Sequence, residues 1–208
     1  MDPVTLVTGR AVPLDRADVD TDQIIPASWL KRIERTGFGE GLFSAWRADP
    51  EFVLNRAEYS GARVLVAGPN FGSGSSREHA AWALQDYGIA AVISPRFADI
   101  FRGNSLKIGL LPVELPAETV DKLMAAVTAD PTVEVTVDLE TRTVSAPAAG
   151  VEASFEIDDF TRYRLMHGLD DIGLTLQHDD EIAVFEAGRP AHLPSVGSAP
   201  AGLSLTEG

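Results

Sequence analysis

The sequence predicts an α/β fold, a layered sheet with parallel strand pairing, and three observations support this prediction. Segments with the patterns of strands and helices alternate from about residue 60 onward. The first of these strands, residues 62–68 (ARVLVAG), is a continuous apolar run, as expected for a strand buried on both faces. Helix-like segments separate the strands that follow, and such alternation favours parallel pairing within one sheet.

The helix after this strand is predicted over residues 75–88. Ala80, Leu84 and Tyr87 fall at helical spacing on one face, and Gly88 occupies the position of a C-terminal cap. The later elements follow from the same patterns and from runs of β-branched residues. In order, they are a strand at 90–94, a helix over 97–106, a strand at 109–115, a helix at 118–127, strands at 133–137, 142–144 and 152–157, and helices at 159–166 and 170–178.

The two ends of the chain have a different character. The first sixty residues mix Asp, Pro and Gly with isolated aromatic residues and predict loops with short helical turns, which often form functional lids. From about residue 188 the chain is rich in Pro, Gly, Ala and Ser, which predicts a disordered tail. We therefore expect a single domain over residues 1–187, with a loop-rich region at 1–60 and an α/β core at 61–187, followed by the tail at 188–208.

Composition excludes several classes of function. The formal charge of -14, from 17 basic and 31 acidic residues, disfavours nucleic acid and anionic membranes as partners. With no cysteine, the chain forms no disulfide and supplies no thiolate to a metal or cluster. The first residues lack the apolar run of a signal peptide, and no stretch approaches the roughly eighteen apolar residues of a membrane span, so we expect a cytoplasmic protein. The histidines are too far apart to predict a metal site: His79, His167, His178 and His192.

The segment most indicative of chemistry is residues 68–80 (GPNFGSGSSREHA), which joins the first predicted strand to the following helix. Ligands of open α/β sheets bind at this carboxyl edge. Ser75, Ser76 and Arg77 are predicted in the first turn of the helix, where unpaired N–H groups and the helix dipole favour an anion. Arg77 adds a planar set of donors suited to a carboxylate. The glycines that let the backbone approach a ligand are Gly68, Gly72 and Gly74.

Other interpretations of this loop stay open. The spacing of Ser75 and Glu78 also fits a capping box, in which each side chain accepts a hydrogen bond from the backbone N–H of the other residue. Nucleotide binding is disfavoured, because the loop lacks both the ending of a P-loop and the spacing of a dinucleotide fingerprint. His79 is predicted to be a packed or hydrogen-bonded histidine rather than a catalytic one.

The string NFGSGSSREHA (70–80) resembles the active-site loop of the swivelling domain in the aconitase superfamily, and DVDTDQIIP (18–26) resembles the segment that opens this domain. Three further strings, at 35–47, 95–113 and 172–186, are similar to the free-standing small subunits of 3-isopropylmalate dehydratases. The resemblance spans roughly residues 5–187. It implies a layered β/β/α swivelling domain of the aconitase type.

The resemblance also implies an activity. A hydro-lyase of this family isomerises 2-isopropylmalate and 3-isopropylmalate by removing water and adding it back, in leucine biosynthesis. A large subunit would hold a four-iron four-sulfur cluster that acts as a Lewis acid on this hydroxy-dicarboxylate substrate, and this chain would bind no cofactor itself. Ser75 would be the catalytic base. Since a neutral hydroxyl is too weak a base, it would act as an alkoxide stabilised by Arg77, backbone N–H groups of the loop and the helix N-terminus.

Further site residues follow from the same resemblance. Ser76 and Arg77 would bind a substrate carboxylate, and Asp22 would orient charged groups, although the residues alone favour a turn or cap role for Asp22. Leu30 or Ile33 would contact the isopropyl group. Aconitases place a substrate-binding arginine shortly after a tryptophan-leucine pair, and the candidates in this chain are Lys31, Arg32 and Arg35.

Two alternatives to this function stay open. One is the small subunit of a related hydro-lyase that acts on homoaconitate or 2-methylmalate, which would differ around Leu30. The other is a non-catalytic binding module in which the glycine-rich loop only caps a helix. In that module, Ser75→Ala would change stability by about 1 kcal/mol and have no other effect.

Overall fold

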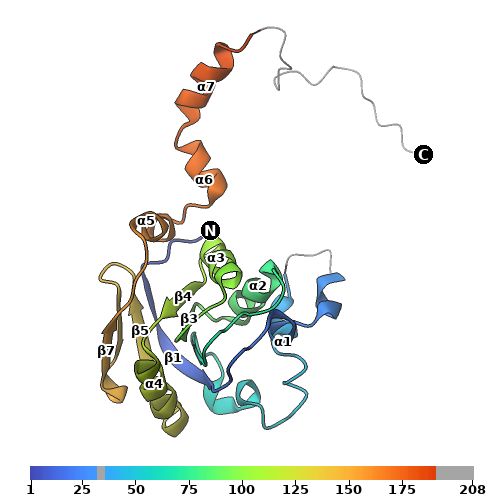
Figure 1. Cartoon of the computed structure of the whole chain (residues 1–208), viewed down its shortest axis with the longest axis vertical. Helices are drawn as coiled ribbons and strands as arrows, with labels where there is room; N and C mark the ends of the chain where they lie inside the picture. Colours follow the sequence, from blue (N-terminus) through green and yellow to red (C-terminus); the bar gives the residue numbers. More distant parts are fainter. Residues whose placement is uncertain (32–35, 191–208) are drawn as a thin grey trace, which may run out of the picture. The chain divides into compact units, whose positions relative to one another are not determined.

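A mixed β-sheet lies at the centre of the computed structural model, which describes residues 1–31 and 36–190 (Figure 1). Within these residues the sheet has seven strands in the order β4-β3-β2-β1-β5-β6-β7. The strands are β1 (Leu6–Leu14), β2 (Val64–Ala67), β3 (Ala91–Ser94), β4 (Leu111–Glu114), β5 (Glu134–Asp138), β6 (Thr143–Ala146) and β7 (Val151–Ser154). The α/β class with parallel pairing is confirmed, and the parallel part comprises β1 to β4.

Strand β1 joins the parallel and antiparallel parts of the sheet. Its residues 6–10 pair antiparallel with β5, and its residues 11–14 pair in parallel with β2. Burial follows this division, because residues 11–14 are all buried whereas residues 6–10 are mostly not. The prediction of loops throughout the first sixty residues is therefore wrong at β1. Gly9 and Pro13, which usually interrupt strands, lie inside it and hid the pattern.

The helices of this part of the chain connect successive strands in the predicted order. The connecting helices are α2 (Glu78–Tyr87), α3 (Asp99–Ile108) and α4 (Ala117–Ala129), and α5 (Asp159–His167) follows β7. Helix α4 packs on β1 and β2, and α2 packs against α3. Gly88 caps α2 as predicted, with a left-handed backbone at φ 107°.

Residues between β1 and β2 form short helical turns, as the sequence predicts. They are α1 (Thr21–Ile24) and the 3-10 helices η1 (Ala27–Lys31), η2 (Phe38–Gly41), η3 (Val53–Asn55) and η4 (Ala57–Tyr59). Several of their apolar side chains belong to the main core, and Phe38, Leu42 and Phe43 are fully buried. Turn η2 is held against α2, since the Gly39 N–H donates to Asp86 at 2.8 Å. These turns therefore form part of the folded core.

The chain divides into two compact units, Met1–Asp170 and a second unit that begins at Asp171. The second unit contains α6 (Asp171–Leu176), which matches the helix predicted at 170–178, and α7 (Asp179–Ala187), which was not predicted. The single domain over residues 1–187 stays a prediction. Most of the predicted tail, residues 191–208, lies outside the described residues.

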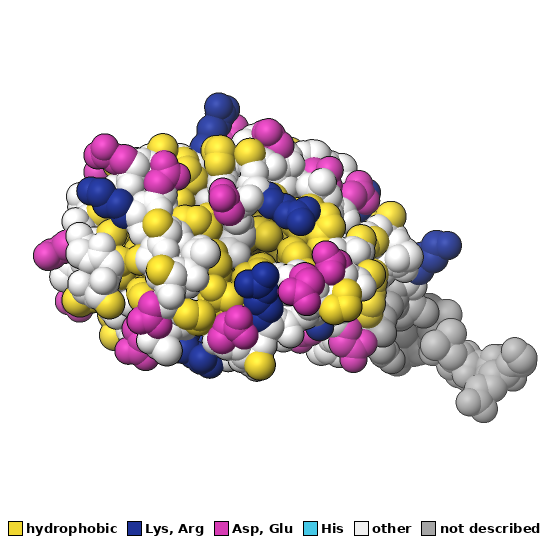
Figure 2. Space-filling model, turned by 90° about the horizontal axis from the view of Figure 1, so that it is seen from below, with side chains coloured by type: hydrophobic (Ala, Val, Ile, Leu, Met, Phe, Trp, Pro, Cys, Tyr) yellow, Lys and Arg dark blue, Asp and Glu magenta, His cyan; other side chains and the backbone are white. Residues whose placement is uncertain are grey.

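Charge on the surface agrees with the composition. On the face seen in Figure 2, lysine and arginine side chains lie singly among acidic and apolar ones. The described residues of this face therefore present no continuous basic surface to a nucleic-acid backbone. Among the described helices, none combines the length and apolarity that crossing a bilayer requires.

Candidate active site

The glycine-rich loop follows the carboxyl end of β2, and glycine is required at two positions because the protein's own atoms are close. A Cβ at Gly68 would overlap the carbonyl of Arg16, and one at Gly72 would overlap the Phe101 ring. Gly72 is buried at φ 79°, and its N–H donates to the Val19 carbonyl at 2.7 Å. Of the two glycines predicted to present backbone to an anion, Gly74 is the one that lies on the surface.

A second segment, residues 18–22, runs beside this loop although it is about fifty residues away in the sequence. The Thr21 N–H donates to the Ser73 carbonyl at 2.8 Å, and Asp20 and Ser73 form a parallel bridge. The Thr21 side chain is buried, and its hydroxyl donates to the Ser75 carbonyl at 2.9 Å. The backbone of Ser75 is therefore fixed from β1's side of the sheet edge as well as from β2's.

Arg77 forms an ion pair with Asp22 that connects the two segments. The Arg77 side chain is 19% exposed and that of Asp22 is 56% exposed, so the pair lies at the rim of the protein. The cap or turn alternative for Asp22 is wrong, because Asp20 caps α1. The Asp20 carboxylate accepts from the Gln23 N–H at 2.8 Å, and the Gln23 side chain accepts from the Asp20 N–H at 2.9 Å.

The capping box predicted between Ser75 and Glu78 is not formed. Helix α2 begins at Glu78, and its N-cap residue is Arg77, with an extended backbone and no capping side chain. The expectation that Ser75, Ser76 and Arg77 occupy the first turn is therefore also wrong. Both serines are exposed in the loop before the helix, and within the described part of the chain neither hydroxyl makes a hydrogen bond. A purely capping role for Ser75 has no structural support.

His79 is a packed side chain, as predicted. Its ring lies 5.2 Å from the ring of Phe38, edge-on, and 4.6 Å from that of Trp82. Burial lowers the pKa of the imidazole below its ordinary value of 6.5, Glu78 acts weakly in the opposite direction, and Arg77 lowers it further. The neutral ring therefore supports the start of α2 from below the exposed loop.

Comparison with known proteins identifies the family. Over 195 residues the chain is 69% identical to the 3-isopropylmalate dehydratase small subunit of Parafrankia sp., which covers 94% of this chain and 99% of that relative. The chain belongs to the 3-isopropylmalate dehydratase small-subunit family. Similar small subunits from Rubrobacter xylanophilus and Streptomyces coelicolor are each 63% identical, covering 94% and 93% of this chain and 100% and 98% of the relatives.

Family models and a solved structure agree with this membership. The Aconitase C-terminal domain family matches residues 1–118, LeuD_N matches residues 121–159, and the C-terminal domain family of the 3-isopropylmalate dehydratase small subunit matches residues 171–194. A crystal structure of a 3-isopropylmalate dehydratase from Methanocaldococcus jannaschii superposes with a TM-score of 0.66 at 26% identity. It covers 86% of this chain and 99% of that one. The resemblance of the glycine-rich loop to aconitase-type proteins is thereby confirmed at the level of the family.

The predicted specificity residues of this family member are only partly described. Leu30 lies half-buried in η1, and Lys31 is exposed at its end. The ring of Trp29 packs so closely on Gly41 that a Cβ there would contact it at 2.6 Å, which fixes the base of this segment. The three remaining candidates, Arg32, Ile33 and Arg35, lie outside the described residues.

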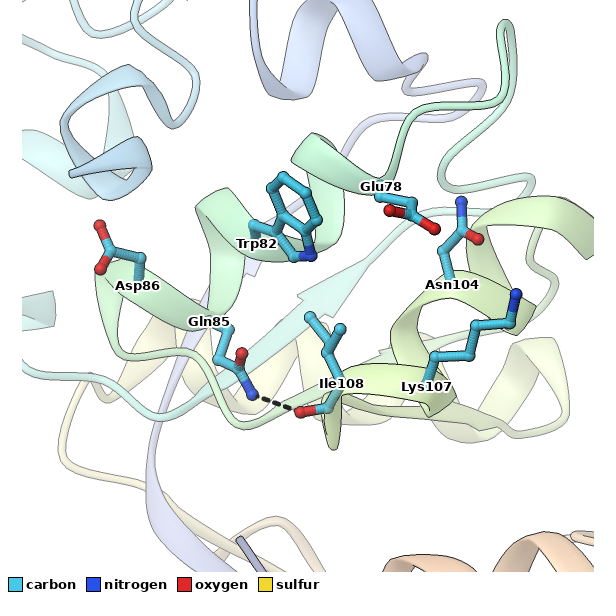
Figure 3. Close-up of a pocket in the computed structure, with 7 residues that line it drawn as sticks. All are labelled: Glu78, Trp82, Gln85, Asp86, Asn104, Lys107 and Ile108. Carbon is cyan, nitrogen blue, oxygen red and sulfur yellow. Dashed lines mark hydrogen bonds between the residues drawn. The ribbon is translucent and has the colours of Figure 1, made fainter. Parts of the chain in front are cut away.

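The small subunit presents half of a site. Asp22, Ser75, Ser76 and Arg77 lie together at the carboxyl edge of the parallel strands, and none of them lines a hollow of about 600 Å³ between α2 and α3. That hollow is bordered by Glu78, Trp82, Gln85, Asp86, Asn104, Lys107 and Ile108, and is spanned by the hydrogen bond from Gln85 to the Ile108 carbonyl (Figure 3). The predicted site residues thus lie on an open surface that a second protein can cover.

Sequence reasoning missed two residues of this arrangement. Asp20 could have been found, since the spacing from Asp20 to Gln23 is itself that of a capping box. The contact of Thr21 with Ser75 has no sequence signal, because nothing in the local pattern of either segment refers to the other.

Proposed function

We propose that this chain completes the active site of a 3-isopropylmalate dehydratase, the hydro-lyase that interconverts 2-isopropylmalate and 3-isopropylmalate in leucine biosynthesis. The observation that carries the proposal is the exposed Ser75 beside the ion pair of Arg77 with Asp22, at the carboxyl edge of the parallel strands. Membership of the small-subunit family supports the choice of substrate. The proposal places the complex in the cytoplasm.

A large subunit is the required partner. The reaction of this family uses a four-iron four-sulfur cluster, which supplies Lewis-acid chemistry at the substrate hydroxyl when bound. This chain does not fit as its host, because it contains no cysteine. Its site is also an open surface rather than an enclosed cavity. The proposal therefore assigns the cluster to the large subunit, and the catalytic base and part of the carboxylate-binding site to this chain.

Ser75 is proposed to remove the proton from the carbon next to a substrate carboxylate. A serine performs this step only as an alkoxide, and the positive charge of Arg77, two residues along an extended loop, favours the ionised form. Covering the loop with the large subunit would exclude water and strengthen this interaction. The hydrogen bond from Thr21 to the Ser75 carbonyl holds the backbone in place for the proton transfer.

Arg77 and Ser76 are proposed to bind a substrate carboxylate. Asp22 engages one nitrogen of the Arg77 guanidinium, and a guanidinium has five N–H donors in a fixed plane. Asp22 therefore sets the direction of the remaining donors while leaving them available to a carboxylate. Leu30, at the half-buried end of the following turn, is proposed to contact the isopropyl group. An apolar contact of this kind discriminates between close analogues by only about 1–3 kcal/mol.

The decisive experiment compares Ser75→Ala with Ser73→Ala in complexes purified anaerobically with the large subunit from the same source. Ser73 lies in the same loop, and its hydroxyl makes only a long hydrogen bond of 3.5 Å, so it is a matched control. With 2-isopropylmalate, formation of the unsaturated intermediate is followed by absorbance. We expect Ser75→Ala to lower kcat by about 10²–10⁴-fold and Ser73→Ala to leave it nearly unchanged.

The complex must be intact for the comparison to count, so its assembly is measured by size-exclusion chromatography. If Ser75→Ala assembles normally and keeps most of its activity, Ser75 is not the base. If the wild-type complex assembles but turns over homoaconitate or 2-methylmalate in preference to 2-isopropylmalate, the substrate assignment is wrong and the related hydro-lyase is correct.

A further inference from the structure

The second unit of the chain exposes large apolar side chains to an unusual degree. In α6, Ile172 and Leu176 are 71% and 63% exposed, and in α7, Val184 and Phe185 are 74% and 72% exposed. Ile172 and Leu176 are four residues apart, so they lie on the same side of α6. Clustered apolar side chains at such exposure within about fifteen residues are typical of a surface that contacts another protein.

The two helices are also too short to be stable by themselves. Helix α6 has six residues and α7 has nine, whereas an isolated helix needs about 12–15 residues to be even marginally stable in water. Local contacts add little: Thr175 donates to the Asp171 carbonyl at 2.9 Å, and His178 and Glu181 form a pair on the surface. Burial of the apolar side chains against a partner would supply the missing stability.

Charge indicates what kind of partner this is. Residues 171–190 contain a single basic residue, Arg189, and five acidic ones: Asp171, Asp179, Asp180, Glu181 and Glu186. A second copy of this segment would bring the same negative charge, and the whole chain has a formal charge of -14. Like charges disfavour both arrangements. The complementary surface is therefore apolar and bordered by lysine or arginine.

We propose that α6 and α7 form the docking element by which this small subunit attaches to its large subunit. The apolar side chains of the two helices would occupy a groove on the large subunit, and the acidic first turn of α7 would pair with basic residues at its border. The family models agree with a separate role, since the C-terminal match at residues 171–194 is distinct from the aconitase-type match at 1–118. This inference rests on the proposed function, which requires the large subunit.

The test measures the affinity of purified large subunit for three small subunits, by anaerobic calorimetry at low and high salt. They are the wild-type chain, the double variant Val184→Ser/Phe185→Ser, and the control Ala183→Ser/Ala187→Ser. Valine, phenylalanine and serine have similar helix propensities, whereas alanine is the best helix former, so the control weakens the helix at least as much. We expect the Val184/Phe185 variant to raise Kd at least about tenfold, and the control to change it less than about threefold.

Two further readouts complete the test. Added salt should weaken wild-type binding, because the acidic turn contributes to it. Turnover at saturating large subunit should equal that of wild type for both variants, since neither changes a residue of the site. Unchanged Kd in the Val184/Phe185 variant overturns the proposal. Loss only of self-association of the small subunit, in sedimentation velocity, also overturns it and makes a second copy the occupant. A wild-type complex that binds but does not convert 2-isopropylmalate refutes the proposed function and leaves the docking element intact.

Discussion

Arg77 and Asp22 form an ion pair across 55 residues of sequence, at the point where the segment after β1 meets the loop after β2. Both residues were expected to contact charged groups of the substrate, and the structure places them in contact with each other. Asp22 is therefore a positioning residue for the Arg77 guanidinium in the free subunit. The pair also explains why the backbone at Arg77 is extended and α2 begins only at Glu78.

Asp22→Ala should separate function from stability. Because Asp22 is 56% exposed, losing its carboxylate should change the free energy of unfolding by less than about 1 kcal/mol. The freed guanidinium should bind substrate in the wrong orientation, which should lower kcat/KM by about 100-fold. Steady-state kinetics of the complex and urea unfolding of the small subunit measure the two effects. Asp20→Ala, which removes the cap of α1, should instead cost about 1 kcal/mol of stability.

The Thr21 hydroxyl should affect both folding and turnover. Thr21→Val keeps the shape of the buried side chain but removes the hydrogen bond to the Ser75 carbonyl, so we expect a loss of about 1–3 kcal/mol and a lower kcat. Thr21→Ser retains the hydroxyl and should restore most of kcat. Urea unfolding and turnover with saturating large subunit measure these effects. Equal kcat values for the valine and serine variants would contradict a role in positioning Ser75.

Gly72 should tolerate substitution much less well than Gly88, although both have positive φ. Alanine at Gly88 meets no atom within 4 Å, so Gly88→Ala measures the cost of the left-handed backbone alone, about 1–2 kcal/mol. Alanine at Gly72 adds an overlap with the Phe101 ring and should destabilise the fold by several kcal/mol or prevent folding. Urea unfolding compares the two variants. Similar losses would show that the Phe101 ring moves aside easily.

His79 should make the stability of the small subunit fall in weak acid. Its folded pKa lies below the unfolded value of 6.5, so the unfolded state binds a proton more readily. The associated stability is fully present above pH 6.5 and is lost as the pH falls toward the folded pKa. Urea unfolding at a series of pH values should show this slope in wild type and a smaller slope in His79→Gln. The same slope in both proteins would show that the His79 ring is not responsible.

Short-range patterns in the sequence were sufficient for much of the fold. The apolar run at β2, the periodic apolar residues of α2 and the glycine at its C-terminus all predicted their elements, because each signal depends on residues within a few positions. The family of the chain and the candidate Ser75, with Ser76 and Arg77, also came from the sequence, through the resemblance of one loop. Pattern alone failed at β1, where Gly9 and Pro13 disrupt the strand signal and pairing on both sides restores it.

The site was decided by tertiary contacts. Two segments carry the pattern of a capping box, Asp20 to Gln23 and Ser75 to Glu78, and only the first forms one. The backbone at Ser75 is held by Thr21 and that at Arg77 by Asp22, so the loop stays extended and Ser75 remains exposed. The sequence by itself determined which residue types occupy the loop and the elements around it. Which of them meet was decided by β1 and β2 pairing in parallel, because that pairing brings together two segments whose local patterns contain no information about each other.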